Sequence, residues 1–354
     1  MPNSLPPLAD VHKLLVVKTS SLGDVIHALP VVQTIKDAAP HLSLGWVVRR
    51  RCADILAGNP VIDYLYVVPD KPSLRDILQL RRELRLPRYD MALDMQGLAL
   101  SGLLTRLSGA SVRVGWDRNR EGNAFFLTHP IVPGKAKDAH EIDLLYGFAD
   151  ALGVHASHPE FTPQPYLAAE NAAQAEEWLQ NLPRPRIALN VGASRAYKRW
   201  PLPNWAEVAQ ALTRSGRSVV FVGDKKDAET VAQITLHLSG GFVDLAGRTS
   251  LRQLASVLAA CDLLVSGDSG PMHLAVAVGT PALAIFGATR PARHGPYGAR
   301  NIVLHDPAPG LTTPGKRPTE AEGAACMARV TPEQVLKEIS RLAPQQTASQ
   351  DLSQ

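Results

Sequence analysis

The sequence has few of the residues that define several classes of protein. Among 354 residues there are three cysteines, Cys52, Cys261 and Cys326, too scattered for a disulfide framework or a zinc site. So few cysteines are typical of a reducing compartment. Aromatic residues make up 5% of the chain and are not interleaved with its basic residues. We therefore expect no nucleic-acid partner.

Long apolar runs are also missing. No stretch approaches the roughly 20 apolar residues that a membrane-spanning helix needs. The N-terminal segment, MPNSLPPLADVHK, is interrupted by prolines and has no apolar core, so we do not expect a signal peptide. These absences predict a cytoplasmic protein and leave a peripheral contact with a membrane surface open.

Four well-known site motifs are absent. The chain contains no HExxH, GxxxxGK[ST], GxSxG or GxGxxG pattern, which removes the main support for a metalloprotease, a P-loop enzyme, an α/β-hydrolase or a dinucleotide-binding protein. The formal net charge of +4 is mild and argues only weakly for anionic ligands.

The sequence does contain short apolar runs that alternate with segments of helical period. The expected strands and helices of the first half are 14–17, 25–39, 44–48, 64–68, 74–86 and 91–94. The corresponding segments of the second half are 187–191, 204–216, 219–222, 262–266, 282–286 and 331–342. In this half we expect helix N-caps at Asn204, paired with Glu207, at Asp224, and at Ser250, paired with Gln253. Such βαβα alternation predicts an α/β protein with parallel sheets covered by helices on both faces.

A proline-rich stretch divides the two halves. It includes one expected helix, 168–182, and proline-dense segments of this kind connect domains. We predict a first domain at 1–165, a linker at 166–185, a second domain at 186–344 and a disordered tail at 345–354. Two Rossmann-like domains of this kind face each other across a cleft and bind ligands at the carboxyl ends of their strands.

The loop after the first expected strand, 18–24, is the first candidate site. Ser21 and Gly23 are small enough to let a substrate approach the backbone. Asp24 is either a chemical group or a carboxylate that stabilises a helix start. A helix N-terminus lowers the pKa of a carboxylate, which weakens it as a base. We expect Pro30 to kink or restart the helix that follows.

Two loops of the second half could bind phosphate. In 191–201, a glycine turn followed by Lys198 suits a phosphate group, although a solvated basic loop explains it as well. In 266–274, Ser269 is the expected N-cap of a helix whose first turn contains Pro271. A helix start of this kind is an anion site. Asp268 would repel a phosphate, so it more readily contacts hydroxyls or orients donors.

Charged residues elsewhere carry weaker signals. Asp224, Asp227 and Glu229 follow a strand, where a carboxylate can accept ribose hydroxyls, but helix capping accounts for the first two. The basic run 71–88 is either a solvated helix face or a surface for a phosphorylated acceptor or an anionic membrane. His273 alone would be interpreted as a buried core histidine, and its place beside the 266–274 loop favours a function.

Three segments resemble a known family. KTSSLGDVIHALP (18–30), KRWP (198–201) and SGDSGPMHLA (266–275), followed by GTP (279–281) and FGAT (286–289), are similar in content and order to the motifs of the lipopolysaccharide heptosyltransferases, glycosyltransferase family nine. The heptosyltransferase I branch is the most similar. The resemblance covers about Lys13 to Leu342.

The resemblance implies a GT-B fold and an inverting, metal-independent transfer of heptose from ADP-heptose to a sugar hydroxyl of the lipopolysaccharide inner core or another glycolipid, on the cytoplasmic face of the inner membrane. It places the general base on Asp24 and the donor-phosphate lysine on Lys198. Other residues implied for the donor are Gly192, Ala193, Ser194, Glu229, Asp268, Ser269, Gly270 and His273. Those implied for the acceptor are Ser21, Gly23 and Arg120. No cofactor is implied.

Two positions depart from the heptosyltransferase I branch, and other functions stay open. Ala193 and Ser194 stand where that branch has two threonines, and the basic cluster expected for a Kdo-bearing lipid A acceptor is matched only loosely by 71–88. The ribose carboxylate aligns with either Asp227 or Glu229. A nucleotide-sugar epimerase or hydrolase, or a non-catalytic nucleotide-sugar binding protein, could use the same architecture.

Overall fold

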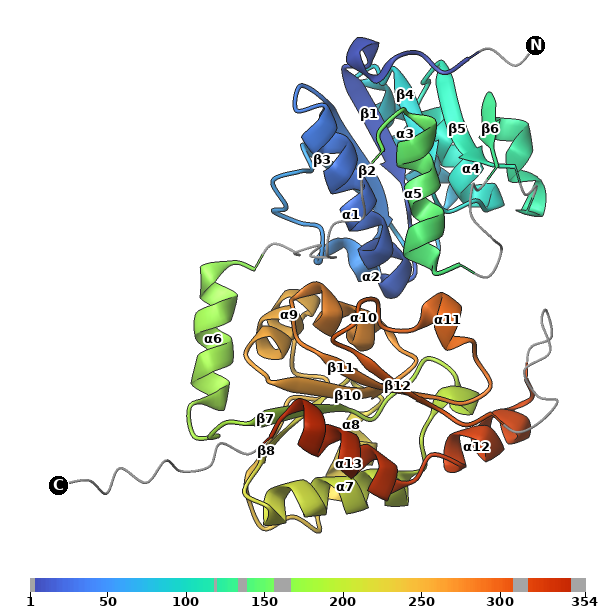
Figure 1. Cartoon of the computed structure of the whole chain (residues 1–354). Coiled ribbons are helices and arrows are strands. Elements are labelled where there is room, and N and C mark those ends of the chain that lie inside the picture. The colour runs from blue at the N-terminus through green and yellow to red at the C-terminus, as the bar shows by residue number, and fades with distance from the viewer. Residues whose placement is uncertain (1–3, 118–119, 133–138, 156–166, 308–317, 345–354) are drawn as a thin grey trace. The chain divides into compact units, whose positions relative to one another are not determined.

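The computed structural model describes residues 4–117, 120–132, 139–155, 167–307 and 318–344 (Figure 1). The chain divides into two compact units, Met1–Tyr166 and Leu167–Gln354. Each unit contains a six-stranded sheet in which the paired strands are parallel, as expected for the α/β class. The helix Ala169–Leu179 (α6), within the predicted linker, packs against helix Leu251–Ala259 (α9) of the second unit. The predicted tail lies outside the described residues.

The first unit is built on a sheet of order β3-β2-β1-β4-β5-β6. Its strands are β1 (Lys13–Val17), β2 (Ser43–Arg49), β3 (Tyr64–Val68), β4 (Met91–Asp94), β5 (Val112–Trp116) and β6 (His129–Ile131). Its helices are α1 (Leu22–Ala38), α2 (Arg50–Ala53), α3 (Leu74–Arg85), α4 (Ala99–Leu107) and α5 (Glu141–Ala151), with 3-10 segments η1 (Leu8–Asp10) and η2 (Arg120–Phe126).

Helices on both faces explain the uninterrupted apolar run of β1. Leu14, Leu15, Val16 and Val17 are all fully buried. Successive side chains of a strand point to opposite faces. Leu15 and Val17 pack in one core cluster with residues of α3 and α4, and the other two point to the opposite face. α1 and α5 pack against each other, and α3 packs against α4.

The second unit repeats this plan with a sheet of order β12-β11-β10-β7-β8-β9. Its strands are β7 (Arg186–Asn190), β8 (Ser218–Val222), β9 (Phe242–Asp244), β10 (Leu263–Gly267), β11 (Ala282–Phe286) and β12 (Ile302–His305). Besides α6 and α9, its helices are α7 (Leu202–Arg214), α8 (Ala228–Thr235), α10 (Gly270–Ala277), α11 (Pro291–His294), α12 (Glu320–Ala328) and α13 (Pro332–Leu342), with the 3-10 turn η3 (Ala196–Lys198).

The second sheet is also covered on both faces. Trp205 of α7 and Ile339 of α13 belong to one large core cluster with Ile187 and Leu189 of β7. A separate cluster joins Met272 of α10 to alternate residues of β11. The three cysteines are buried free thiols, and burial raises the pKa of Cys261 to about 12.

Each sheet has a point at which the order of the strands reverses. The chain runs from β1 outward to β3, returns to the centre and runs outward again from β4 to β6. β7 and β10 are the corresponding central pair of the second sheet. In open parallel sheets, ligands bind outside the carboxyl ends of such a central pair. The segments after β1 and β4, and those after β7 and β10, are therefore the places to look for a site.

Some local predictions are wrong, because a neighbouring residue takes the predicted role. α7 begins at Leu202 with Pro201 as its N-cap, so Asn204 lies in the first turn rather than at the cap. The N-cap of α8 is Asp227 and not Asp224. α1 runs through Pro30 as one helix, so the predicted restart is wrong, whereas the alternative of a kink stays a prediction. The predicted caps Ser250 and Ser269 are both confirmed.

Candidate functional site

The loop after β1 is held by the segment after β4. Oε1 of Gln96 accepts hydrogen bonds from the backbone N–H groups of Thr19 and Ser20, both at 3.0 Å. The buried Nζ of Lys18 donates to the carbonyl of Met95 at 3.0 Å, and the indole of Trp46 donates to the carbonyl of Lys18. Lys18, Thr19 and Ser20 follow β1, and Met95 and Gln96 follow β4, so the central strand pair fixes the shape of the loop.

Asp24 occupies the first turn of α1 and bonds to the N-cap of that helix. Its Oδ2 accepts from the N–H of Ser21 at 2.8 Å and from the Ser21 hydroxyl at 2.6 Å. Its Oδ1 lies 3.9 Å from Nζ of Lys18, and 36% of its side chain is exposed. Asp24 therefore has the structural role that the sequence allows.

A buried carboxylate supports the Gln96 segment. Oδ1 of Asp94 accepts from the N–H groups of Gln96 at 3.1 Å and Gly97 at 2.9 Å. Burial raises the pKa of Asp94, and the hydrogen bonds from Gly97, Ser101, Asn123 and Gln96 oppose that rise. Asp94 therefore acts on the candidate site only through Gln96, as a positioning residue.

The raised pKa of Asp94 predicts a pH-dependent contribution to stability. The folded state binds the proton of this carboxyl more tightly than the unfolded state, whose pKa is about 3.9. The free energy of unfolding therefore falls as the pH rises from that value through the native pKa. Asp94→Asn removes this titration, so its stability relative to the wild type should improve with rising pH in urea unfolding series. Parallel curves for the two proteins would contradict the prediction.

The central pair of the second sheet carries a network of hydroxyl and amide groups. Nδ2 of Asn190, the last residue of β7, donates to the carbonyl of Gly192 at 3.1 Å and to the hydroxyls of Ser266 at 3.0 Å and Ser269 at 3.1 Å. The two serine hydroxyls are 2.8 Å apart. Asn190 thus joins the predicted phosphate loop after β7 to the start of α10.

The same network explains an unusual feature of the α10 start. Ser269 is the N-cap residue, but its side chain makes no capping hydrogen bond to the first turn. Its hydroxyl is instead engaged by Asn190 and Ser266. Pro271 in the first turn contributes no N–H group. The helix start therefore presents backbone donors that Ser269 does not cap, which is the arrangement of an anion site.

Lys198 and Asp268 come together beside this helix start. Nζ of Lys198 lies 2.6 Å from Oδ2 of Asp268, and their side chains are 20% and 10% exposed. An ammonium has three donors, so one bond to Asp268 leaves two for another oxygen ligand. The ion pair places Asp268 where it can orient the Lys198 ammonium, one of the two roles that the sequence leaves open for this carboxylate. The structure also places buried His273 in the first turn of α10.

Asp227 lies much closer to the 191–194 loop than the sequence indicates. A Cβ on Gly192 would stand 2.1 Å from Oδ2 of Asp227, so a side chain at this position would displace the Asp227 carboxylate. Oδ2 accepts from the N–H of Asp224 at 2.9 Å, and burial raises the pKa of Asp227. Glu229, by contrast, is exposed on the first turn of α8. Of the two candidate ribose carboxylates, Asp227 is the one against the loop.

The remaining candidates are placed more simply. Ala193 is half-buried and Ser194 exposed in the loop after β7, and Gly270 is the first residue of α10. Gly23 is buried in the first turn of α1. Arg120 begins η2, and its side chain lies outside the described part of the structure.

Asp24 belongs to the first unit and Lys198 to the second, so their meeting across a cleft stays a prediction.

Two features are absent from the described residues. They contain no group of three or more histidine, cysteine, aspartate or glutamate side chains arranged to hold a metal ion. No helix in the described ranges is both long enough and apolar enough to cross a membrane.

Comparison with known proteins gives consistent matches. The sequence pattern of glycosyltransferase family 9 (heptosyltransferase) matches residues 77–316. Lipopolysaccharide heptosyltransferase 1 of Pseudomonas aeruginosa is 30% identical over 93% of this chain and 98% of its own. The E. coli heptosyltransferase WaaC, solved with ADP, is 26% identical, with a TM-score of 0.75 over 94% of this chain and 100% of its own. The structure of the same enzyme with ADP-2-deoxy-2-fluoro heptose has a TM-score of 0.71 over the same shares of both chains. The predicted GT-B fold is confirmed.

Proposed function

Since the chain belongs to glycosyltransferase family 9, the heptosyltransferases, we propose that it transfers heptose from ADP-heptose to a sugar hydroxyl of the lipopolysaccharide inner core. The family match carries the proposal. WaaC, a relative over nearly the whole chain, has been solved with ADP and with an ADP-heptose analogue. We place the reaction on the cytoplasmic face of the inner membrane, where such an acceptor is assembled.

The donor is assigned to the second unit. The loop after β7 and the uncapped start of α10 offer backbone N–H groups to the diphosphate, and Lys198 adds a positive charge. These groups stabilise the negative charge that develops on ADP as the glycosidic bond breaks. We assign the ribose hydroxyls to Asp227 rather than Glu229, because Asp227 packs against Gly192. Ser194 supplies one hydroxyl, and Ala193 leaves a second position without one.

The acceptor is assigned to the first unit. Asp24 removes the proton of the attacking hydroxyl, and Ser21, Gly23 and Arg120 line the approach of the acceptor sugar. Asp24 lies 3.9 Å from Nζ of Lys18, and an aspartate is ordinarily a weak base. It suffices if the proton leaves late, after the donor sugar has gained oxocarbenium character. Attack from the face opposite to the leaving ADP inverts the configuration of the anomeric carbon.

The experiment that tests the proposal is ADP release from ADP-heptose, with and without a Kdo-bearing lipid A acceptor. We expect release that requires the acceptor, yields a heptosylated product and continues in excess EDTA, because Lys198 and α10 supply the charge that a divalent cation would otherwise provide. UDP-glucose serves as the control donor and should not react.

Other outcomes correspond to other functions. Conversion of ADP-heptose without any acceptor would identify an epimerase or hydrolase. Binding without turnover would identify a sensor, and a ligand at 100 times its Kd would then raise the free energy of unfolding by about 2.7 kcal/mol. Loss of turnover in EDTA, restored by added metal, would contradict the metal-independent mechanism alone.

A further inference from the structure

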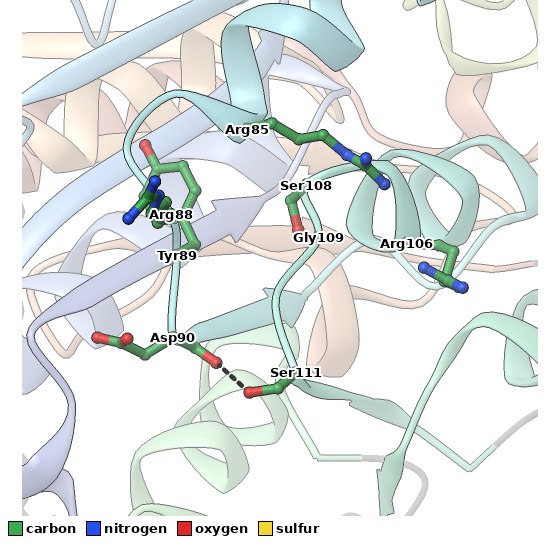
Figure 2. A pocket seen from close by; sticks show the side chains of 8 residues that line it. All are labelled: Arg85, Arg88, Tyr89, Asp90, Arg106, Ser108, Gly109 and Ser111. Carbon is green, nitrogen blue, oxygen red and sulfur yellow. Dashed lines mark hydrogen bonds between the residues drawn. The ribbon is translucent and has the colours of Figure 1, made fainter.

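The first unit contains a cavity at the amino ends of its strands, whereas the Asp24 loop lies at their carboxyl ends. The cavity is open to solvent and has a volume of about 510 Å³ (Figure 2). Its lining residues are Arg85, Arg88, Tyr89, Asp90, Arg106, Ser108, Gly109 and Ser111. Asp90 directly precedes β4 and Ser111 directly precedes β5, so the cavity lies at the amino ends of these strands. Asp24 follows the carboxyl end of β1, one strand length or about 15 Å away along the sheet.

Three arginines from separate segments line this cavity. Arg85 is the last residue of α3, Arg88 lies in the turn before β4, and Arg106 lies near the end of α4. All three are exposed. Among the described residues none of them forms an ion pair. The side chain of Arg85 makes one hydrogen bond, from Nε to the carbonyl of Leu107 at 3.3 Å. Three like charges at one cavity repel one another unless an anion lies between them.

The acidic residue of the cavity does not neutralise these charges. Oδ2 of Asp90 accepts from the backbone N–H groups of His12 and Lys13, both at 2.9 Å. Figure 2 shows its carboxylate directed away from Arg85 and Arg106. The Asp90 carboxylate is therefore tied to the start of β1, and the cavity keeps a positive charge.

Arg88, which lines this cavity, has an unusual backbone conformation. Arg88 has a φ of +57°, in the left-handed region that residues other than glycine seldom adopt. This turn lies three residues after the end of α3, and the Arg88 side chain lines the cavity (Figure 2). A glycine or asparagine would suit this turn better on conformational grounds alone.

We propose that this cavity binds a phosphate monoester or diphosphate group. Guanidinium groups bind phosphate oxygens through paired, charge-assisted hydrogen bonds, and three of them around one cavity match a group with two or more negative charges. Ser111, whose hydroxyl donates to the Asp90 carbonyl at 3.3 Å, lines the same cavity. The bound group lies too far from Asp24 to react there, so the cavity is a second anion site, independent of the proposed transfer.

The test uses the full chain and a readout at the arginines themselves, because pyrophosphate can also bind at α10. Phenylglyoxal modifies accessible arginines, and mass spectrometry measures each position. Pyrophosphate should protect Arg88 and Arg106, and leave Arg81 and Arg82 of α3 unprotected. In Arg106→Gln the pyrophosphate concentration that protects Arg88 should rise about tenfold, the effect of one lost charge-assisted contact. The matched control Arg82→Gln, which removes the same charge outside the cavity, should leave it unchanged.

A second arm separates the two sources of such a phosphate. Wild type, Arg88→Gln/Arg106→Gln and Arg81→Gln/Arg82→Gln are sedimented with phosphatidylcholine vesicles, with and without phosphatidic acid. Binding to phosphatidic acid that only the cavity variant loses identifies a lipid headgroup. Protection by pyrophosphate without vesicle binding identifies a free phosphorylated ligand. Either result supports the proposal. Equal protection of all four arginines by pyrophosphate, or protection of none of them, would overturn the proposal. Equal losses of vesicle binding in the two double variants would overturn it as well.

Discussion

Asp24→Asn should lower the kcat of heptose transfer by about 10³-fold, the usual contribution of a general base. The amide has nearly the size of the carboxylate, and its oxygen can still accept the N–H of Ser21, so the start of α1 should persist. What the amide cannot do is take a proton from the acceptor hydroxyl. The measurement is single-turnover transfer at saturating ADP-heptose, with thermal unfolding of the same samples.

The chain offers a matched control for the helix-capping role of Asp24. In α3, Asp76 bonds to Ser73 with the same geometry, 2.8 Å from the N–H and 2.6 Å from the hydroxyl. These hydrogen bonds also lower the pKa of Asp76. Asp76→Asn should therefore lose as much helix-start stability as Asp24→Asn and keep its full kcat. If both variants lose the same activity, or neither does, Asp24 is a capping residue and not the base.

Prediction from the sequence succeeds where the chemistry is local. β3, β4 and β11 match their expected bounds, because runs such as YLYVV and ALAIF are long enough for one strand and end in turn residues. Ser250 and Gln253 form the expected capping box because both partners lie in one helical turn. The caps at Asn204 and Asp224 are wrong because Pro201 and Asp227 compete for the same role and the pattern does not rank them.

The supporting residues of the site could not be found in this way. Gln96 bonds to Thr19 across 77 positions, and Asn190 bonds to Ser269 across 79. Such contacts arise only when a crossover brings two parallel strands side by side, and neither Gln96 nor Asn190 lies in a charged or glycine-rich motif. The arginine cavity could not be predicted from the sequence for a different reason. Arg85 and Arg88 belong to the basic run 71–88, a pattern that is usually a solvated helix face, and Arg106 lies outside that run. Only the fold brings Arg106 of α4 to the same cavity.

The second large effect is expected at Lys198. Lys198→Met should lower kcat by about 10²-fold, the loss seen when one preorganised group that stabilises developing charge is removed. It should also weaken donor binding, because Asp268 is 10% exposed and would keep its negative charge beside the diphosphate without a partner. We expect the KM for ADP-heptose to rise about tenfold or more, equivalent to one lost charge-assisted contact.

Because Lys198 is paired with Asp268, a double substitution tests the coupling between the two residues, which a single substitution cannot do. Adding Asp268→Asn to Lys198→Met removes the repulsive charge, so the KM should return toward the wild-type value while kcat stays low. Two independent positions would instead give additive effects. Lys337→Met, an exposed lysine of α13, is the control for the loss of one positive charge and should change neither constant. A double variant with a higher KM than Lys198→Met would mean that Asp268 contacts the donor directly, through hydroxyls, rather than orienting the lysine.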